Sequence, residues 1–197
     1  MTDDCGNETT KDQVITVQDV AIPTFTVPAD ITIDAATDCS YDASVDITGD
    51  VANEADNCDT SVEATFTDVV ADGSCEGAKI ITRTWTLMDD CGNAAAAQDQ
   101  IITVQDVMAP TFTVPADITI DAAADCSYDA SVGVTGDVSD ESDNCDTSLE
   151  ATFTDVEADG SCEGAKVITR TWTLIDDCGN AASSPVSYTH LTLPTKA

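Results

Sequence analysis

Basic residues are scarce in this sequence. Its 197 residues include six Lys and Arg against 38 Asp and Glu, which gives a net charge of −32. A surface this acidic repels polyanions, so we expect no nucleic-acid partner and no binding to anionic membranes. The charge suits a soluble extracellular protein, a salt-rich habitat, or a protein that binds divalent cations.

Histidine is almost absent as well, since the chain has only His190. Ser-His-Asp and Cys-His catalytic arrangements therefore lack their base. Zinc is disfavoured too, because the nine cysteines form no CxxC pair. Paired carboxylates could serve a glycosidase, but here the acids recur in duplicate without a basic or aromatic-rich cleft. We therefore predict that the chain is not an enzyme.

Long apolar runs are missing, and the longest is the tetrad of alanines at 94–97. The sequence thus offers no signal peptide and no transmembrane helix, and we expect no membrane insertion by this fragment. Nine cysteines are typical of an exported, disulfide-using protein rather than of a reducing cytosol. The predicted location is extracellular or at the cell surface, with a leader on sequence outside this fragment.

An internal repeat organises what is present. A shift of 87 residues superposes 21–93 on 108–180 with 61 of 73 positions identical, and the pentapeptide DDCGN occurs three times. Such repetition predicts a tandem array of like units, of which this is a piece. The predicted parts are the end of a preceding repeat (1–20), a complete first repeat (21–107), a second repeat lacking its last strand (108–184), and a tail (185–197).

The tail matches neither repeat. Val186–Thr195 resembles the translation of a sequencing-library adapter, and the resemblance begins where the repeat stops. We therefore predict that 185–197 is an assembly artefact outside the fold and that His190 carries no function. The alternative is a genuine C-terminal extension.

The repeats have the pattern of β-structure. Stretches rich in Val, Ile, Thr, Phe and Trp alternate with period two between Gly, Asp, Asn and Pro, and no segment has helical periodicity. The predicted fold class is all-β, with tandem immunoglobulin-like β-sandwiches of about 87 residues stapled by disulfides. In the first repeat we predict strands at 24–34, 44–51, 62–69, 79–88 and 100–104.

Strand parity also predicts burial. Trp85 falls on the inner face of its predicted strand, and Arg83 falls on the same face, where we expect a paired structural arginine. Positions that stay apolar in both repeats, such as Met88 and Ile175, are predicted to lie in the core.

A family resemblance rests on the combined motif ADNCDTS…SCEGAKIITRTWTLMDDCGN…QIITVQD…PTFTVPADITI. It resembles the hyalin-repeat-like (HYR-like), immunoglobulin-fold repeats of large bacterial secreted and surface proteins, over essentially all of 1–184. The resemblance implies an extracellular stalk or adhesive array. Many relatives carry a further cysteine before PADI and another after CGN. This chain has Val27 and the alanines at 94–97 there, so a bond between first and last strands is not expected.

Four cysteines per repeat allow three pairings. Successive cysteines are separated by one predicted strand, and eight residues of strand carry the chain roughly 26 Å. Bonded cysteines need Cα atoms within about 7 Å, so sequence neighbours should lie at opposite poles. The predicted disulfides are Cys39–Cys75 and Cys58–Cys91 in the first repeat, and Cys126–Cys162 and Cys145–Cys178 in the second.

Acidic residues gather beside the cysteines of the pole where the chain enters each repeat. Oxygen-only ligands on loops suit Ca²⁺ better than softer metals, although no stretch matches an EF-hand loop. We hypothesise a calcium site that stiffens each repeat junction, and the alternative is a solvated acidic rim. The candidate ligands are Asp19, Asp56, Asp59, Asp89 and Asp90 at the first junction and Asp106, Asp143, Asp146, Asp176 and Asp177 at the second.

The functional prediction is a non-enzymatic structural or adhesive repeat segment, an extended stalk of a secreted or cell-surface bacterial protein. Near-identical tandem units fit mechanical spacing or multivalent display better than a single active site. The alternative is a carbohydrate- or peptide-binding module that acts through the repeat loops. The expected partners are neighbouring repeats of the same chain and a glycan or protein ligand outside the cell, whose identity the sequence does not reveal.

Overall fold

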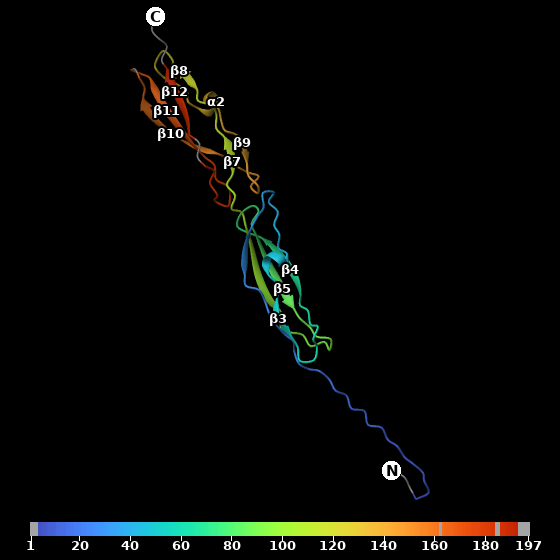
Figure 1. Ribbon diagram of the computed structural model, residues 1–197. Coiled ribbons are helices and arrows are strands. Elements are labelled where there is room, and N and C mark those ends of the chain that lie inside the picture. Colours follow the sequence, from blue (N-terminus) through green and yellow to red (C-terminus); the bar gives the residue numbers. More distant parts are fainter. Residues whose placement is uncertain (1–3, 162, 184–185, 193–197) are drawn as a thin grey trace. The chain divides into compact units, whose positions relative to one another are not determined.

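The computed structural model describes residues 4–161, 163–183 and 186–192, the last of these as backbone (Figure 1). The elements in chain order are β1 (Thr24–Thr26), β2 (Ile31–Asp34), α1 (Val45–Thr48), β3 (Ala52–Ala55), β4 (Thr65–Asp72), β5 (Lys79–Thr86), β6 (Gln98–Gln105), β7 (Thr111–Thr113), β8 (Thr119–Asp121), α2 (Val132–Thr135), β9 (Ser139–Ser142), β10 (Thr152–Asp159), β11 (Lys166–Thr173) and β12 (Val186–Thr192).

The strands build the same pair of sheets twice. The first repeat supplies the sheets β2-β6-β5-β4 and β1-β3, and the strands of the second form β8-β12-β11-β10 and β7-β9. The larger sheet of the first repeat is mixed, because β2 pairs parallel with β6. The predicted all-β, immunoglobulin-like sandwich class is confirmed. In the described residues, the helices α1 and α2 are single turns, far short of a membrane span.

The chain divides into two compact units, which do not coincide with the sequence repeats. The first unit comprises Met1–Pro28, Asp50–Thr67 and Thr84–Gln100, and the second comprises Ala29–Gly49, Asp68–Arg83 and Ile101–Ala197. The predicted repeat boundaries therefore stay a prediction about the sequence.

Each unit has its own core. In the first, Trp85 is 1% exposed and its ring lies 4.9 Å from that of Phe66. In the second, Ile81, Ile102 and Val104 pack into one apolar cluster. Burying one such side chain contributes about 1.5–3 kcal/mol, so these strand faces hold the sheets together.

Arg83 lies on the inner face, as predicted, and is 2% exposed. Its Nε and Nη2 donate to the two carboxylate oxygens of Asp68, both at 2.8 Å. Nη1 donates to the Thr48 hydroxyl and Nη2 also donates to the Ala43 carbonyl. The prediction of a paired structural arginine is confirmed, and Arg170 repeats every one of these bonds in the second repeat.

The strand predicted at 44–51 is wrong. This segment forms the turn of α1, in which the Gly49 N–H donates to the Val45 carbonyl. The Asp42 carboxylate accepts the Ser44 N–H at 2.9 Å and so starts the turn. Gly49 ends it with a φ of 90°, a conformation that glycine adopts without strain. Local side-chain bonding has overridden the alternating apolar pattern.

The predicted burial of Met88 and Ile175 is also wrong, since they are 63% and 52% exposed. Leu87 is 2% exposed, and successive side chains of an extended segment point to opposite faces. Parity therefore turns Met88 outward, and similarity between repeats is a poor guide to burial at this position.

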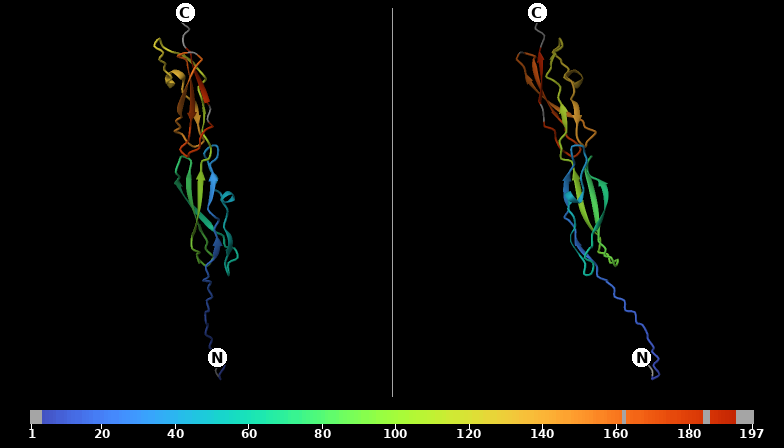
Figure 2. Two further views of the ribbon diagram at one scale, coloured as in Figure 1. Left: turned by 90° about the vertical axis from the view of Figure 1, so that its left-hand side faces the viewer. Right: turned by 45° about the vertical axis from the view of Figure 1, so that its right-hand side comes forward.

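Residues beyond the second repeat supply a strand to its larger sheet. Val186–Thr192, in the tail predicted to lie outside the fold, forms β12 between β11 and β8 (Figure 2). This is the place that β6 takes in the first repeat. The bonding groups of a sheet belong to the backbone, so any extended segment with β-prone residues can complete it. The adapter origin of the tail stays a prediction.

The predicted disulfide pairing is wrong. Cys39 bonds to Cys145 and Cys75 bonds to Cys178, with Cα separations of 5.0 and 5.1 Å, so neither Cys39–Cys75 nor Cys145–Cys178 forms. Cys58 and Cys91 are both free, so the predicted Cys58–Cys91 bond is absent as well. Strand parity constrains which cysteines share a pole, but a cysteine can bond to another repeat as well as within its own. The remaining predicted bond, Cys126–Cys162, involves a cysteine outside the described residues.

Candidate metal site

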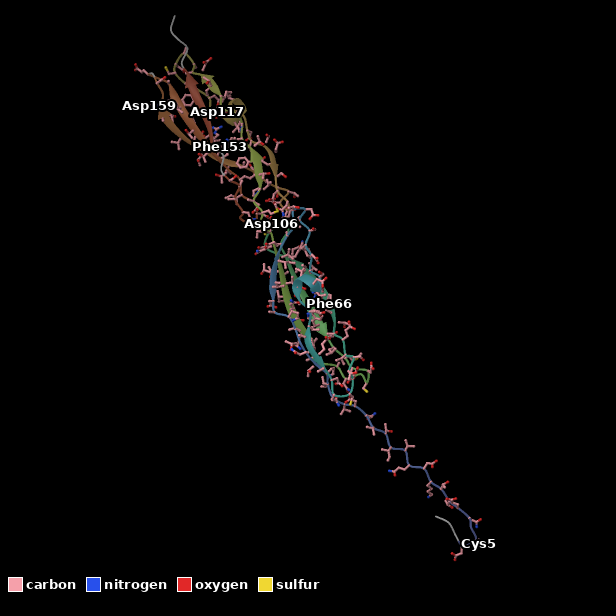
Figure 3. The ribbon with its side chains drawn as sticks, viewed as in Figure 1. Cys5, Phe66, Asp106, Asp117, Phe153 and Asp159 are labelled. Atoms are coloured by element: carbon pink, nitrogen blue, oxygen red, sulfur yellow. A yellow bond between two sulfur atoms is a disulfide. The ribbon has the colours of Figure 1, made fainter. Side chains whose placement is uncertain are left out.

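The second unit contains a triad of aspartates whose carboxylate oxygens all lie within 4.8 Å of one another. Asp106 follows β6 and is labelled in Figure 3, Asp143 follows β9, and Asp176 lies beyond β11. Three separate segments thus deliver one carboxylate each to the same point. We call Asp106, Asp143 and Asp176 the second triad.

Hydrogen bonds from the protein orient each carboxylate. Asn180 donates its backbone N–H and its side-chain amide to the two oxygens of Asp176, at 2.7 and 2.9 Å. The same amide donates to the Asp106 carbonyl at 3.2 Å, which ties that segment to the site. Asp143 Oδ1 accepts the backbone N–H groups of Cys145 and Asp146. These bonds hold the oxygens in place before any ligand arrives.

Two oxygens of the second triad are left without a donor. Oδ2 of Asp106 and Oδ2 of Asp143 are buried and have no hydrogen-bond partner, and Asp106 as a whole is only 6% exposed. A buried acceptor without a partner costs about 1–3 kcal/mol, and more when it is charged. Close carboxylates also repel one another. A cation between them would remove both costs.

The first unit repeats this arrangement. Asp19, Asp56 and Asp89, the first triad, also lie within 4.8 Å of one another. Asn93 donates to both oxygens of Asp89, at 2.7 Å each, and to the Asp19 carbonyl at 3.3 Å. Asp56 Oδ1 is buried without a partner, as its counterpart oxygen is in the second triad. The same triad geometry therefore forms at equivalent positions of the repeated sequence.

The other four predicted ligands lie outside the triads and take part in hydrogen bonds of the surrounding loops. Asp59 and Asp146 each accept a backbone N–H from the following serine and one from the second DDCGN aspartate, Asp90 or Asp177. Asp177 in turn accepts the Glu76 N–H at 2.7 Å. Of the ten candidates, the structure brings six together in two triads and places four around them.

Donor chemistry separates the candidate metals. The triads offer only oxygen, which suits Ca²⁺ or Mg²⁺ rather than zinc. Cys75 and Cys178 lie beside Asp177, but their sulfurs bond to each other and leave no thiolate for a soft metal. In the described residues, the ion pairs of Lys79, Arg83, Lys166 and Arg170 go to other carboxylates.

Local charge, hydrogen bonding and desolvation shift pKa values in the first unit, among them those of Asp89 and Cys58. The amide of Asn93 lowers the pKa of Asp89, so this carboxylate is ionised and available to a cation over a wider pH range. Partial desolvation, and then the negative charge of Asp19, raise the pKa of the Cys58 thiol. Cys58 is therefore mostly a thiol near neutral pH.

Sequence reasoning missed the residues of the first repeat that contact the second. We call residues 36–40 and 74–77 the tip, and residues 143–147 and 176–180 the receiving loops. Gly77, in the tip, lies so close to Cys39 and Cys145 that an added Cβ would collide with both sulfurs. The cysteine count gave no signal of this contact, because each repeat holds four cysteines, an even number that could pair within the repeat.

Comparisons with known proteins add little to this geometry. No protein-family model and no curated protein matches the chain. Among solved structures it is similar to the crystal structure of human mucin-like protocadherin EC1-2, with a TM-score of 0.34 and 11% sequence identity. That likeness covers 87% of this chain and 98% of the protocadherin chain. A likeness this weak carries no argument about function.

Proposed function

We propose that this chain is a non-enzymatic structural segment, an extended stalk in a secreted or cell-surface bacterial protein, with one calcium ion held by each aspartate triad. The buried, unpartnered oxygens of Asp106 and Asp143 carry the proposal. They represent a cost that a bound cation offsets, and the same cost recurs at Asp56.

The calcium ions would act on the junctions between segments. Each triad joins the segment that leads into a repeat to two loops of that repeat, as Asp106 joins Asp143 and Asp176. An ion bridging three carboxylates removes the freedom of the leading segment and so stiffens the chain at that point. The two disulfides and the resemblance to HYR-like repeats support an extracellular setting.

Thermal melting with EDTA and with excess Ca²⁺ tests this function. A ligand at 100 times its Kd stabilises by about 2.7 kcal/mol, which raises Tm by roughly 5–10 °C for a chain of this size. Asp143→Asn should lose part of this rise. Asp46→Asn is the matched control, because Asp46 is exposed, lies outside both triads, and carries the same charge. Equal melting points with and without Ca²⁺ would end the calcium proposal.

A second measurement separates the stalk from a ligand-binding module. A stalk segment has no affinity of its own for glycans or peptides, so the chain should give no saturable signal on a glycan array. Saturable binding that is lost on mutation of loop residues would favour the carbohydrate- or peptide-binding module instead.

A further inference from the structure

In the second unit, hydrogen bonds as well as the two disulfides join the tip to the receiving loops. Thr147 donates its backbone N–H and its hydroxyl to the Glu76 carboxylate, at 3.0 and 3.2 Å. Glu76 donates its own N–H to Asp177 at 2.7 Å. Asn144 donates its amide to the Ala36 carbonyl at 3.1 Å. The receiving loops are therefore a built site whose occupant is a repeat tip.

The first unit carries the same loops at 56–60 and 89–93, with the identical sequences DNCDT and DDCGN. Their side chains line a cavity of about 200 Å³. Cys58 and Cys91 both face this cavity and both are free. Cys58 is exposed, whereas its counterpart Cys145, beneath a tip, is 5% exposed.

A complementary tip also exists in the chain. Cys126 is the counterpart of Cys39 in the second repeat. It is exposed and makes no disulfide with any residue that the structure describes. The counterpart of Cys75 is Cys162, which lies outside the described residues. The loops of the first unit and the tip of the second repeat thus carry free counterparts, Cys58 and Cys126, of the two cysteines that are bonded in Cys39–Cys145.

We propose that the loops 56–60 and 89–93 are a covalent docking site for the tip of another copy of this repeat. Cys58 bonds there to the tip cysteine of that copy, just as Cys145 bonds to Cys39 within this chain, and Cys126 of a second chain supplies such a cysteine. The two surfaces that meet are different, so the contact is head-to-tail and differs from the self-complementary contact of a two-fold dimer. The proposal extends the structural role but does not depend on calcium.

The bond forms by thiol–disulfide exchange. The Cys58 thiolate attacks oxidised glutathione, which releases one glutathione thiolate and leaves a mixed disulfide. The Cys126 thiolate of the second chain then attacks the Cys58 sulfur and releases the second glutathione. Two protein thiols lose two protons and two electrons, and one glutathione disulfide becomes two glutathione thiols.

A complementation experiment in EDTA tests the docking. One variant, Cys58→Ser with Cys91→Ser, loses the cysteines of the loops 56–60 and 89–93 but keeps the tip cysteines of the second repeat. The other variant, Cys126→Ser with Cys162→Ser, loses those tip cysteines but keeps the cysteines of the loops 56–60 and 89–93. In a glutathione redox buffer each variant alone should stay monomeric, and the equimolar mixture should give dimers on non-reducing gels. Wild-type chain should give a ladder, and Cys5→Ser should give the same ladder.

Peptide mapping of an isotopically heavy and light mixture then identifies the bond. We expect a Cys58–Cys126 peptide that joins heavy to light chains, with Cys39–Cys145 intact in every sample. A Cys58–Cys91 bond within one chain, or a mixture that stays monomeric, would overturn the proposal. Because EDTA is present throughout, failure of the calcium sites leaves this result unaffected.

Discussion

Replacing Arg83 with methionine should strongly destabilise the protein. Arg83 is 2% exposed and makes both of its bonds to Asp68 at 2.8 Å. Breaking a buried ion pair by removing one partner costs about 3–5 kcal/mol, because the other charge loses its counterion. The Asp68 side chain is 28% exposed, so water recovers part of the loss and the lower end applies. We therefore expect Arg83→Met to lower the free energy of unfolding by about 3 kcal/mol.

Urea unfolding, followed by tryptophan fluorescence with the disulfides intact, measures this change. The double variant Arg83→Met with Asp68→Leu should recover much of the loss, since it leaves no buried charge behind. Lys79→Met is the control, because the Lys79–Asp72 pair lies on the surface and should contribute little. A loss below about 1 kcal/mol for Arg83→Met would refute the claim that this ion pair organises the inner face.

Two further changes test local contacts. Gly77→Ala should destabilise by about 1–3 kcal/mol more than Gly92→Ala in urea unfolding, because both glycines have a positive φ but only at Gly77 would an added Cβ collide with a disulfide, whereas at Gly92 it would meet nothing within 4 Å. Equal losses would contradict this close approach. Asn93→Ala removes the bonds that lower the pKa of Asp89. A lowered folded-state pKa contributes stability above the unfolded pKa of about 4 and loses it as pH falls. In EDTA, the stability gap between wild type and Asn93→Ala should therefore be present at pH 7 and shrink below pH 4, and a gap that widens there would contradict the assignment.

Much of the fold was predictable because it depends on patterns that act along a single strand. Alternation placed Trp85 and Arg83 on the buried face, and both lie there. It failed at Val45–Thr48, where hydrogen bonds from loop side chains start a helical turn. A periodicity of apolar residues carries no information about such bonds, which depend on the exact placement of Asp and Ser.

The candidate site was predictable in outline for a different reason. Strand lengths decide which loops share a pole, so the gathering of Asp19, Asp56 and Asp89 follows from counting residues. Which of the neighbouring aspartates turn inward does not follow, because Asp59 and Asp90 differ from them only in loop conformation. The disulfide partners could not be predicted from the sequence for a related reason. Residue counting within one repeat says nothing of which surfaces of two repeats meet.

The number of calcium ions bound per chain tests the central claim most directly. Isothermal titration of the chelator-treated chain should give two saturable sites, one for each triad. Asp56→Asn and Asp143→Asn should each leave one site, and the double variant should leave none, while Asp46→Asn retains both. Binding that never saturates, or a stoichiometry that the triad variants leave unchanged, would mean that these carboxylates form no calcium site.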